Sequence, residues 1–166
     1  GNDLKFTLDS LYCEDQKGRT LSMYLGSNRL PDFSNNCNHD FDSLHEANQD
    51  SIVDRLYAAH GFPTVADVGD RGNKVLPYMI LHTTDTTFQN HYLPIVQKAC
   101  EEQLISWEFY AMLYDKINIV RNGHQRYGTQ YILENGHVLS GLFPFEEEEK
   151  TAEYRKQVGL VPLSDF

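Results

Sequence analysis

The sequence predicts a mainly α-helical, single-domain protein with five or six helices and one small β-hairpin. Apolar residues recur at three- and four-residue spacing over most of the chain, which is typical of amphipathic helices. The one clear hairpin signal is Asn135-Gly136. The 166 residues suffice for one hydrophobic core but are too few for two comfortable ones, so we expect residues 1–166 to form a single domain.

The first predicted helix runs from Asp3 to about Thr20, because Leu4, Leu8 and Leu11 share one helical face. The segment that follows, 26–43, is crowded with Asn, Asp, Ser, Gly and Pro. That composition favours turns over regular structure, so we expect a long loop there.

Two further helices are expected at about 44–59 and 70–82. The first turns Ile52 and Val53 inward, and Gly61 is placed to end it in the left-handed conformation. Pro77 lies inside the second and predicts either a kink or a split into two pieces.

The next two predicted helices occupy about 87–103 and 106–120. Pro94 is a kink point in the first of them. The second is the most strongly patterned of the chain, and Asn122-Gly123 is expected to stop it.

The hairpin is expected over about 125–142, with Asn135-Gly136 at its turn. A last helix is expected within 145–159, because acids fill its first turn and Arg155 and Lys156 lie near its end, which matches the helix dipole. Gly159 supplies its stop signal.

Charge and composition exclude several classes of protein. Fourteen Lys and Arg against 24 Asp and Glu give a net charge of −10, which argues against a nucleic-acid partner. No segment has the roughly 18 to 20 apolar residues of a membrane helix. The chain begins without a leader, so we expect a soluble protein that is compatible with secretion or a periplasmic location after leader removal.

The cysteines indicate neither a zinc ribbon nor a disulfide framework. Cys13, Cys37 and Cys100 are widely spaced, and we expect no structural bridge between any two of them.

Three predicted helices carry charge toward their inner faces. The stripe of the first helix continues to Asp15 and Arg19, the helix at 70–82 ends its apolar face at His82, and the helix at 106–120 continues its face to Asp115. Each has an ordinary alternative: a helix that runs past the core edge, a histidine at a helix end, or a hydrogen-bonded buried acid.

The first arm of the hairpin is polar where a packed strand would be apolar. Gln125, Tyr127 and Thr129 would share one face of a strand, and Gly128 is placed to bend the chain and bring Gln130 to them. We therefore expect these side chains to converge with the charged helix positions in one polar cleft.

Seven ordered motifs resemble a bacterial family of uncharacterised domains. They are Asp15-Gln16 with Arg19, "HGFPTVADVG", "LHTTD", "FQNHYLP", Asp115-Lys116, "QRYGTQ" and "GLVPLSDF". The family pattern is Asp-Gln-x-x-Arg, Gly-Trp-Pro, Gln-His-Ala-Asp, Phe-Gln, Asp-Arg, Gln-x-Tyr-Gly-Thr-Gln and Gly-Leu-x-Pro-Leu. This sequence departs from it at Phe62 for Trp, Leu81 for Gln and Lys116 for Arg. The resemblance implies motif positions and a single domain but no reaction.

The residues support an enzyme hypothesis with His82 and Asp115 as catalytic acid–base residues, in a hydrolase or group transferase acting on a polar small molecule. The substrate-binding residues would be Asp15, Gln16, Arg19, Gln125, Tyr127 and Gln130. No Gly-x-Ser-x-Gly elbow or other nucleophile motif stands out, which argues against acyl-enzyme chemistry.

Two alternatives remain open at the level of sequence. The same residues would serve a non-catalytic binding module for a polar small molecule or a peptide, or a purely structural polar network. No cofactor is expected, because nucleotide fingerprints are absent. No metal is expected either, although His39, Asp40, Asp42 and His45 form a loop cluster that is more typical of solvated side chains.

Overall fold

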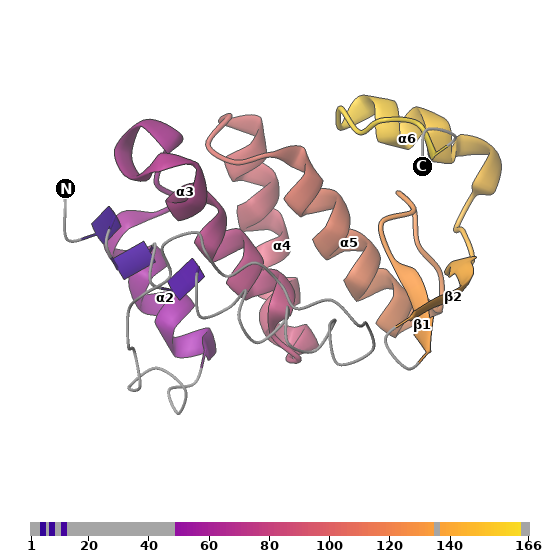
Figure 1. Cartoon of the computed structure of the whole chain (residues 1–166), viewed down its shortest axis with the longest axis horizontal. Coiled ribbons are helices and arrows are strands. Elements are labelled where there is room, and N and C mark those ends of the chain that lie inside the picture. The colour runs from indigo at the N-terminus through magenta and orange to yellow at the C-terminus, as the bar shows by residue number, and fades with distance from the viewer. Residues whose placement is uncertain (1–3, 6, 9–10, 13–48, 135–136, 164–166) are drawn as a thin grey trace. The chain divides into compact units, whose positions relative to one another are not determined.

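The computed structural model describes residues 4–5, 7–8, 11–12, 49–134 and 137–163, and the mainly helical class is confirmed for this part of the chain (Figure 1). Its elements are the helices α2 (Gln49–His60), α3 (Val65–His82), α4 (Thr86–Glu101), α5 (Trp107–Asn122) and α6 (Thr151–Gln157), the 3-10 helix η1 (Glu148–Lys150), and the strands β1 (Tyr131–Glu134) and β2 (His137–Leu142). The two strands pair into an antiparallel hairpin.

The chain divides into two compact units, and the main boundary lies within α3, between Met79 and Ile80. The first holds the described residues up to Met79, and its apolar core includes Leu8, Ile52, Val53 and Val75. The six described positions between 4 and 12 are helical, as the spacing of leucines predicted.

Helix α3 is interrupted near its start by Gly69, which has φ 78° and ψ 172°. Only glycine adopts this backbone conformation without strain, so the helix begins again at Asp70, where the sequence placed its start. Pro77 lies inside the continuous part without splitting it. The buried side chain of Asn73 donates to the carbonyl of Pro63 at 2.8 Å and ties the segment before α3 to the helix.

The second unit contains α4, α5, α6 and the described hairpin residues other than His137, which is grouped with the first unit. Helices α4 and α5 run side by side and pack on each other (Figure 1). Asp85 caps the start of α4 by accepting from the backbone N–H groups of Thr87 and Phe88. Ser106 caps α5 in the same way, and Gly123 ends that helix in the left-handed conformation, as the sequence predicted.

The last helix is shorter than the sequence predicted. Residues 145–147 are not helical, because the segment is held in an extended form: the N–H of Glu146 donates to the carbonyl of Gln125 at 2.7 Å, and Gln125 forms a parallel bridge with Phe145. The four consecutive glutamates therefore do not open a single long helix.

The first arm of the predicted hairpin is also different. Strand β1 begins at Tyr131, so residues 125–130 precede the sheet and form a separate turn. We call this segment the polar turn. Its conformation determines the geometry of the candidate site.

Of the three cysteines, which were expected to form no bridge, Cys100 is a free, buried thiol. Cys13 and Cys37 lie outside the described residues.

Candidate functional site

Asp115, in the middle of α5, is fully buried and organises the polar turn. Its Oδ1 accepts from the N–H of Arg126 at 2.7 Å and from that of Tyr127 at 3.0 Å. Its Oδ2 accepts from the N–H of Thr129 at 3.0 Å and from the Thr129 hydroxyl at 2.9 Å. A carboxylate with this many donors satisfies the need of a buried charge for partners.

Two opposing effects set the acidity of Asp115. Burial raises its pKa, and the hydrogen bonds from Tyr127, Arg126 and Thr129 lower it again. Burial is the larger effect, so the pKa of Asp115 lies above the ordinary value of a carboxyl group. All its donors belong to the polar turn, and its role in this geometry is to fold that turn.

The amide of Gln125 is fully buried and acts as a partner for the backbone. Its Nε2 donates to the carbonyls of Gln130 at 3.0 Å and Phe143 at 2.9 Å, while its Oε1 accepts from the N–H of Gln130 at 2.9 Å. The end of the polar turn and the exit of β2 are also joined by the backbone, because the N–H of Phe143 donates to the carbonyl of Gln130 at 3.3 Å. The glutamine side chain therefore reinforces the backbone pairing at this point.

Tyr127 is buried at the centre of an aromatic cluster. Its ring contacts Tyr114 at 5.6 Å, Tyr110 at 6.3 Å and Tyr154 at 6.5 Å between centroids, each near edge-to-face. Burial raises the pKa of Tyr127 to about 12. The phenol is therefore neutral at physiological pH.

Arg126 lies over two rings of this cluster, Tyr114 at 4.5 Å and Tyr154 at 5.1 Å from the centroids. Its guanidinium also pairs with Glu146 through Nε at 2.8 Å and Nη2 at 3.3 Å. The two aromatic faces and the carboxylate together anchor the segment before η1 to the polar turn.

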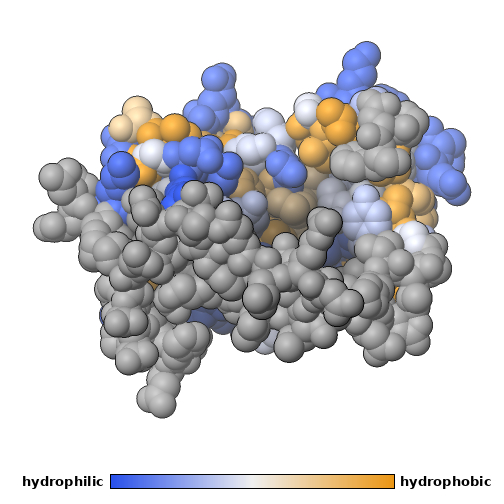
Figure 2. All heavy atoms as spheres, in the orientation of Figure 1, coloured by the Kyte–Doolittle hydropathy of each residue, from blue (hydrophilic) through white to orange (hydrophobic). Residues whose placement is uncertain are grey.

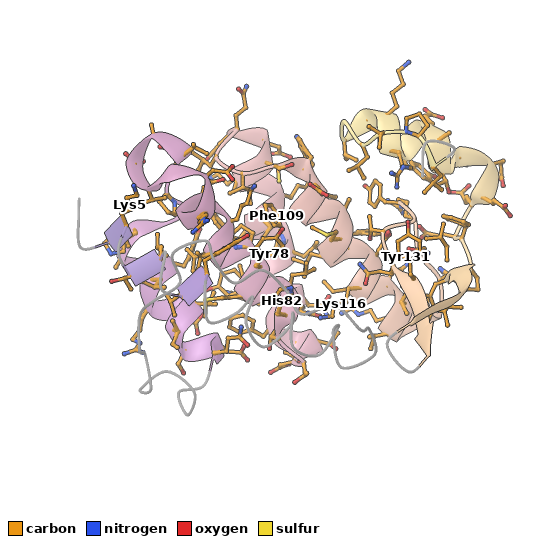
Figure 3. All side chains as sticks on the ribbon, viewed as in Figure 1. Lys5, Tyr78, His82, Phe109, Lys116 and Tyr131 are labelled. Carbon is orange, nitrogen blue, oxygen red and sulfur yellow. The ribbon has the colours of Figure 1, made fainter. Side chains whose placement is uncertain are left out.

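His82 is the last residue of α3, and two side chains hold the backbone on both sides of it. Nε2 of Gln89 donates to the carbonyls of Leu81 at 3.2 Å and Thr83 at 3.0 Å, and Nζ of Lys116 donates to the same two carbonyls. Figure 3 shows His82 beside Lys116 at this end of the helix. The adjacent residues Asp115 and Lys116 thus hold two different motif segments.

The structure brings four of the predicted site residues into one hydrogen-bonded cluster: Asp115, Gln125, Tyr127 and Gln130. His82 is not among the donors to Asp115, whose oxygens are occupied by the polar turn. Asp15, Gln16 and Arg19 lie outside the described residues, as do His39, Asp40, Asp42 and His45. Within the described part of the chain, no three His, Cys, Asp or Glu side chains are grouped to hold a metal ion.

A pocket of about 380 Å³ is lined in part by the polar turn. Its walls come from α5, from the polar turn with the start of β1, and from α6 with the residues after it. The side chains that line it include Glu108, Met112, Thr129, Tyr131, Arg155, Leu160 and Val161.

Arg155 is the buried cation of this pocket, with 3% of its surface exposed. Its Nη1 donates to the carbonyl of Tyr127 at 2.6 Å and its Nε donates to that of Val161 at 2.7 Å. Burial lowers the pKa of Arg155, and the attraction of Tyr131 and Asp115 acts in the opposite direction.

Sequence reasoning missed Arg155 because it interpreted this residue as a dipole complement at a helix end. A signal was present: Thr151, Tyr154, Arg155 and Val158 have the i, i+3, i+4, i+7 spacing of a single buried face. Thr151 and Arg155 are both 3% exposed. The sequence pattern therefore indicated an arginine on the inward face of a short helix.

Comparison with known proteins gives one match. A family model described as a family of unknown function (DUF6624) matches residues 41–166, which include every predicted site residue except Asp15, Gln16 and Arg19. Neither the curated proteins nor the solved structures contain a match to this chain. In the described residues, no helix is both long and apolar enough to cross a bilayer.

Proposed function

The chain belongs to the family of unknown function DUF6624, and from the geometry of its pocket we propose that it is a non-catalytic binding module for a small molecule. The observation that carries the proposal is the pocket between α5, the polar turn and the residues after α6. Its volume of about 380 Å³ falls within the range of roughly 300 to 1,000 Å³ typical of ligand sites.

The lining of the pocket supports this proposal. Met112 and Leu160 supply apolar surface, and Thr129 and Arg155 supply a few convergent polar groups, which is the usual composition of a small-molecule site. Thr129 and Arg155 are held by the hydrogen-bond network of the polar turn, so the site is formed before a ligand arrives.

A pocket-filling substitution tests the proposal. A fragment library screened by ligand-observed NMR should yield binders of the wild-type protein, and Met112→Trp should abolish their binding, because the indole occupies the space beside Thr129. Met112 takes no part in any hydrogen bond described above. Binders that remain equally strong with Met112→Trp would place the ligand site elsewhere.

The enzyme hypothesis is a second candidate, supported by the way the backbone around His82 is held. Gln89 and Lys116 fix the carbonyls on either side of it, and a catalytic group benefits from such a rigid support. Asp15, Gln16 and Arg19 would bind the substrate, while the buried Gln125 and Tyr127 and the neighbouring Gln130 would shape the polar turn. Asp115 would then act through the polar turn, since its oxygens are occupied there.

This candidate is tested by His82→Gln in a screen of hydrolase and transferase substrates. An enzyme should lose turnover in the variant while its melting temperature stays close to that of the wild type. If the wild type shows no turnover that the variant lacks, the enzyme hypothesis fails and the binding module remains.

For the cluster of Asp115, Gln125, Tyr127 and Gln130 itself, we propose a structural role. Its polar groups bind the backbone of the polar turn and of β2, which accounts for amides in a segment where a strand would carry apolar residues.

A further inference from the structure

Glu108 is the acid of the pocket wall, and it is an exposed residue in the first turn of α5. Its backbone N–H donates to the hydroxyl of Ser106 at 3.2 Å, which belongs to the cap of the helix. Among the residues that the structure describes, none donates a hydrogen bond to its carboxylate or forms an ion pair with it. The carboxylate therefore keeps its acceptors for a group that enters the pocket.

Arg155 is the other charged residue of the wall, and the protein itself holds its guanidinium. The side chain is buried, it donates to the carbonyls of Tyr127 and Val161, and the carboxylate of Asp115 attracts it. Glu108 precedes Asp115 by about two turns of α5, which is roughly 10 Å along the helix axis. The guanidinium is thus part of the support of the polar turn, and Glu108 is the charge that a ligand meets at the first turn of α5.

The wall next to Glu108 is suited to an apolar body. Met112 follows Glu108 by one turn on the same helical face, and Leu160 and Val161 supply further apolar surface. Val161 and Tyr131 are 54% and 40% exposed, although both line the pocket. In the region of α6 and the chain after it, hydrophobic residues reach the surface beside hydrophilic ones (Figure 2). Exposed apolar side chains around a pocket indicate a ligand that covers them.

Resting on the proposed binding function, we propose that this pocket takes small apolar amines in their cationic form, with the ammonium group at Glu108. The apolar group lies along Met112, Leu160 and Val161. The net charge of −10 on the chain also favours the approach of a cation. Because Glu108 is exposed and water screens its charge, an amine should bind only about three- to fivefold more tightly than a neutral molecule of the same shape.

Three probes with the same phenyl ring test the proposal by ligand-observed NMR and isothermal titration calorimetry at neutral pH: phenethylamine, phenethyl alcohol and phenylacetate. The amine, a cation, should bind most tightly, the neutral alcohol less tightly, and the carboxylate least tightly. The advantage of the amine over the alcohol should shrink toward one in about 1 M salt, because a solvent-exposed ion pair is screened there.

Two variants locate the binding. Met112→Trp should abolish binding of the amine and the alcohol alike, because the indole fills the pocket. Val161→Lys should weaken binding of the amine more than that of the alcohol, because it adds a cation at an exposed position of the wall. The second variant keeps the test valid if the first does not fold.

Glu108→Gln tests the charge selection. It should lower the affinity for the amine to that for the alcohol and leave the affinity for the alcohol unchanged, since only the amine pairs with the carboxylate. Glu149→Gln is the matched control, because it removes one negative charge from an exposed acid outside the pocket. The control should keep the preference for the amine, which separates the acid of the pocket from the net charge of the chain.

The outcomes separate the two proposals. If the alcohol binds as tightly as the amine and both are lost in Met112→Trp, the pocket binds ligands but the selection of amines is wrong. If Glu149→Gln removes the preference as fully as Glu108→Gln, or if no probe binds, or if binding is unchanged in both pocket variants, the amine proposal is wrong. A fragment screen with no binder sensitive to Met112→Trp would overturn the binding function as well.

Discussion

The polar turn is held from two sides by opposite charges, and the two sides differ in what surrounds them. The N–H of Tyr127 donates to Asp115 and its carbonyl accepts from Arg155, so one residue bridges an anion and a cation. Asp115 is sealed inside the protein, with its oxygens taken by backbone and hydroxyl donors. Arg155 borders a pocket of about 380 Å³.

This difference separates a carboxylate that is enclosed by its own chain from a guanidinium that lines a cavity. A buried carboxylate whose oxygens accept hydrogen bonds from its own chain stabilises one conformation, and few of its lone pairs remain for a substrate. The guanidinium of Arg155 fixes the carbonyls of Tyr127 and Val161 and also forms part of the cavity wall. Substitutions at Asp115 and in its surroundings should distinguish these two roles.

The largest effect is expected from Asp115→Asn. The amide keeps one acceptor oxygen and turns an NH₂ group toward the donors of the polar turn, which leaves buried N–H groups unsatisfied. We expect the free energy of unfolding to fall by at least about 3 kcal/mol, measured by urea denaturation. An exposed acid on the same helix, Glu108→Gln, should change it little. Equal stability of wild type and Asp115→Asn would contradict a structural role.

The next effect is expected from Gly128→Ala. Gly128 has φ +69°, and a Cβ there would lie 3.0 Å from Phe145 and 3.1 Å from Leu163. The backbone strain and the contact together should cost about 2 to 4 kcal/mol.

Gly123→Ala is the matched control for this substitution. Its φ is +79°, but a Cβ there meets nothing within 4 Å, so only the backbone strain of about 1 kcal/mol is expected. If both variants lose the same stability in thermal and urea denaturation, Leu163 and Phe145 do not pack on the polar turn as described.

A smaller effect is expected from Gln89→Leu, which tests the support of His82. Gln89 is 2% exposed and donates to carbonyls at the end of α3, but Lys116 donates to two of the same carbonyls. The loss should therefore be about 1 to 2 kcal/mol. Gln97→Leu on the same helix is the control, since Gln97 bonds only an exposed glutamate at 3.1 Å. A change no larger than that of the control would show that the end of α3 does not depend on Gln89.

The smallest effect concerns pH. Because burial raises the pKa of Asp115 above its unfolded value, the part of its stabilisation that is linked to its proton is fully present below the unfolded pKa and is lost as pH rises through the folded pKa. A carbon-13 NMR titration of the aspartate carboxyl groups should give Asp115 a pKa above that of exposed Asp67, whose pKa is lowered by Thr64. The opposite order would mean that the four donors outweigh burial.

The helices were predictable because each carries a local signal. The spacing of Ile52 and Val53, the capping Ser106 and the stop at Gly123 act within a few residues of their own helix. The predicted helix boundary was wrong where a contact between residues distant in the sequence sets the backbone conformation. Residues 145–147 are extended because Gln125 and Arg126 bind Glu146, and Arg126 lies twenty residues before Glu146 in the sequence. No periodicity within 145–159 encodes that contact.

Part of the candidate site could be predicted because some of its residues also carry a local signal. An aspartate on the apolar face of α5 and a row of amides before a hairpin indicated a buried polar cluster, and Asp115 with Gln125 forms part of one. What each group binds could not be read from its type, since a carboxylate accepts from an imidazole or from backbone N–H groups equally well. Arg155 was overlooked because the helix dipole gave an adequate explanation of its position.

The residues after α6 have a consequence for any shortened version of this protein. Arg155 accepts the N–H of Leu160 on its carbonyl at 2.9 Å and donates to the carbonyl of Val161, and Leu163 lies against the position of Gly128. Terminal segments are usually dispensable, but this one closes a wall. A fragment that ends at Gly159 would retain every helix from α2 to α6 but would lack the carbonyl of Val161, one of the acceptors that align the buried guanidinium of Arg155. Its circular dichroism spectrum would still be helical, but the pocket wall formed by Leu160 and Val161 would be missing.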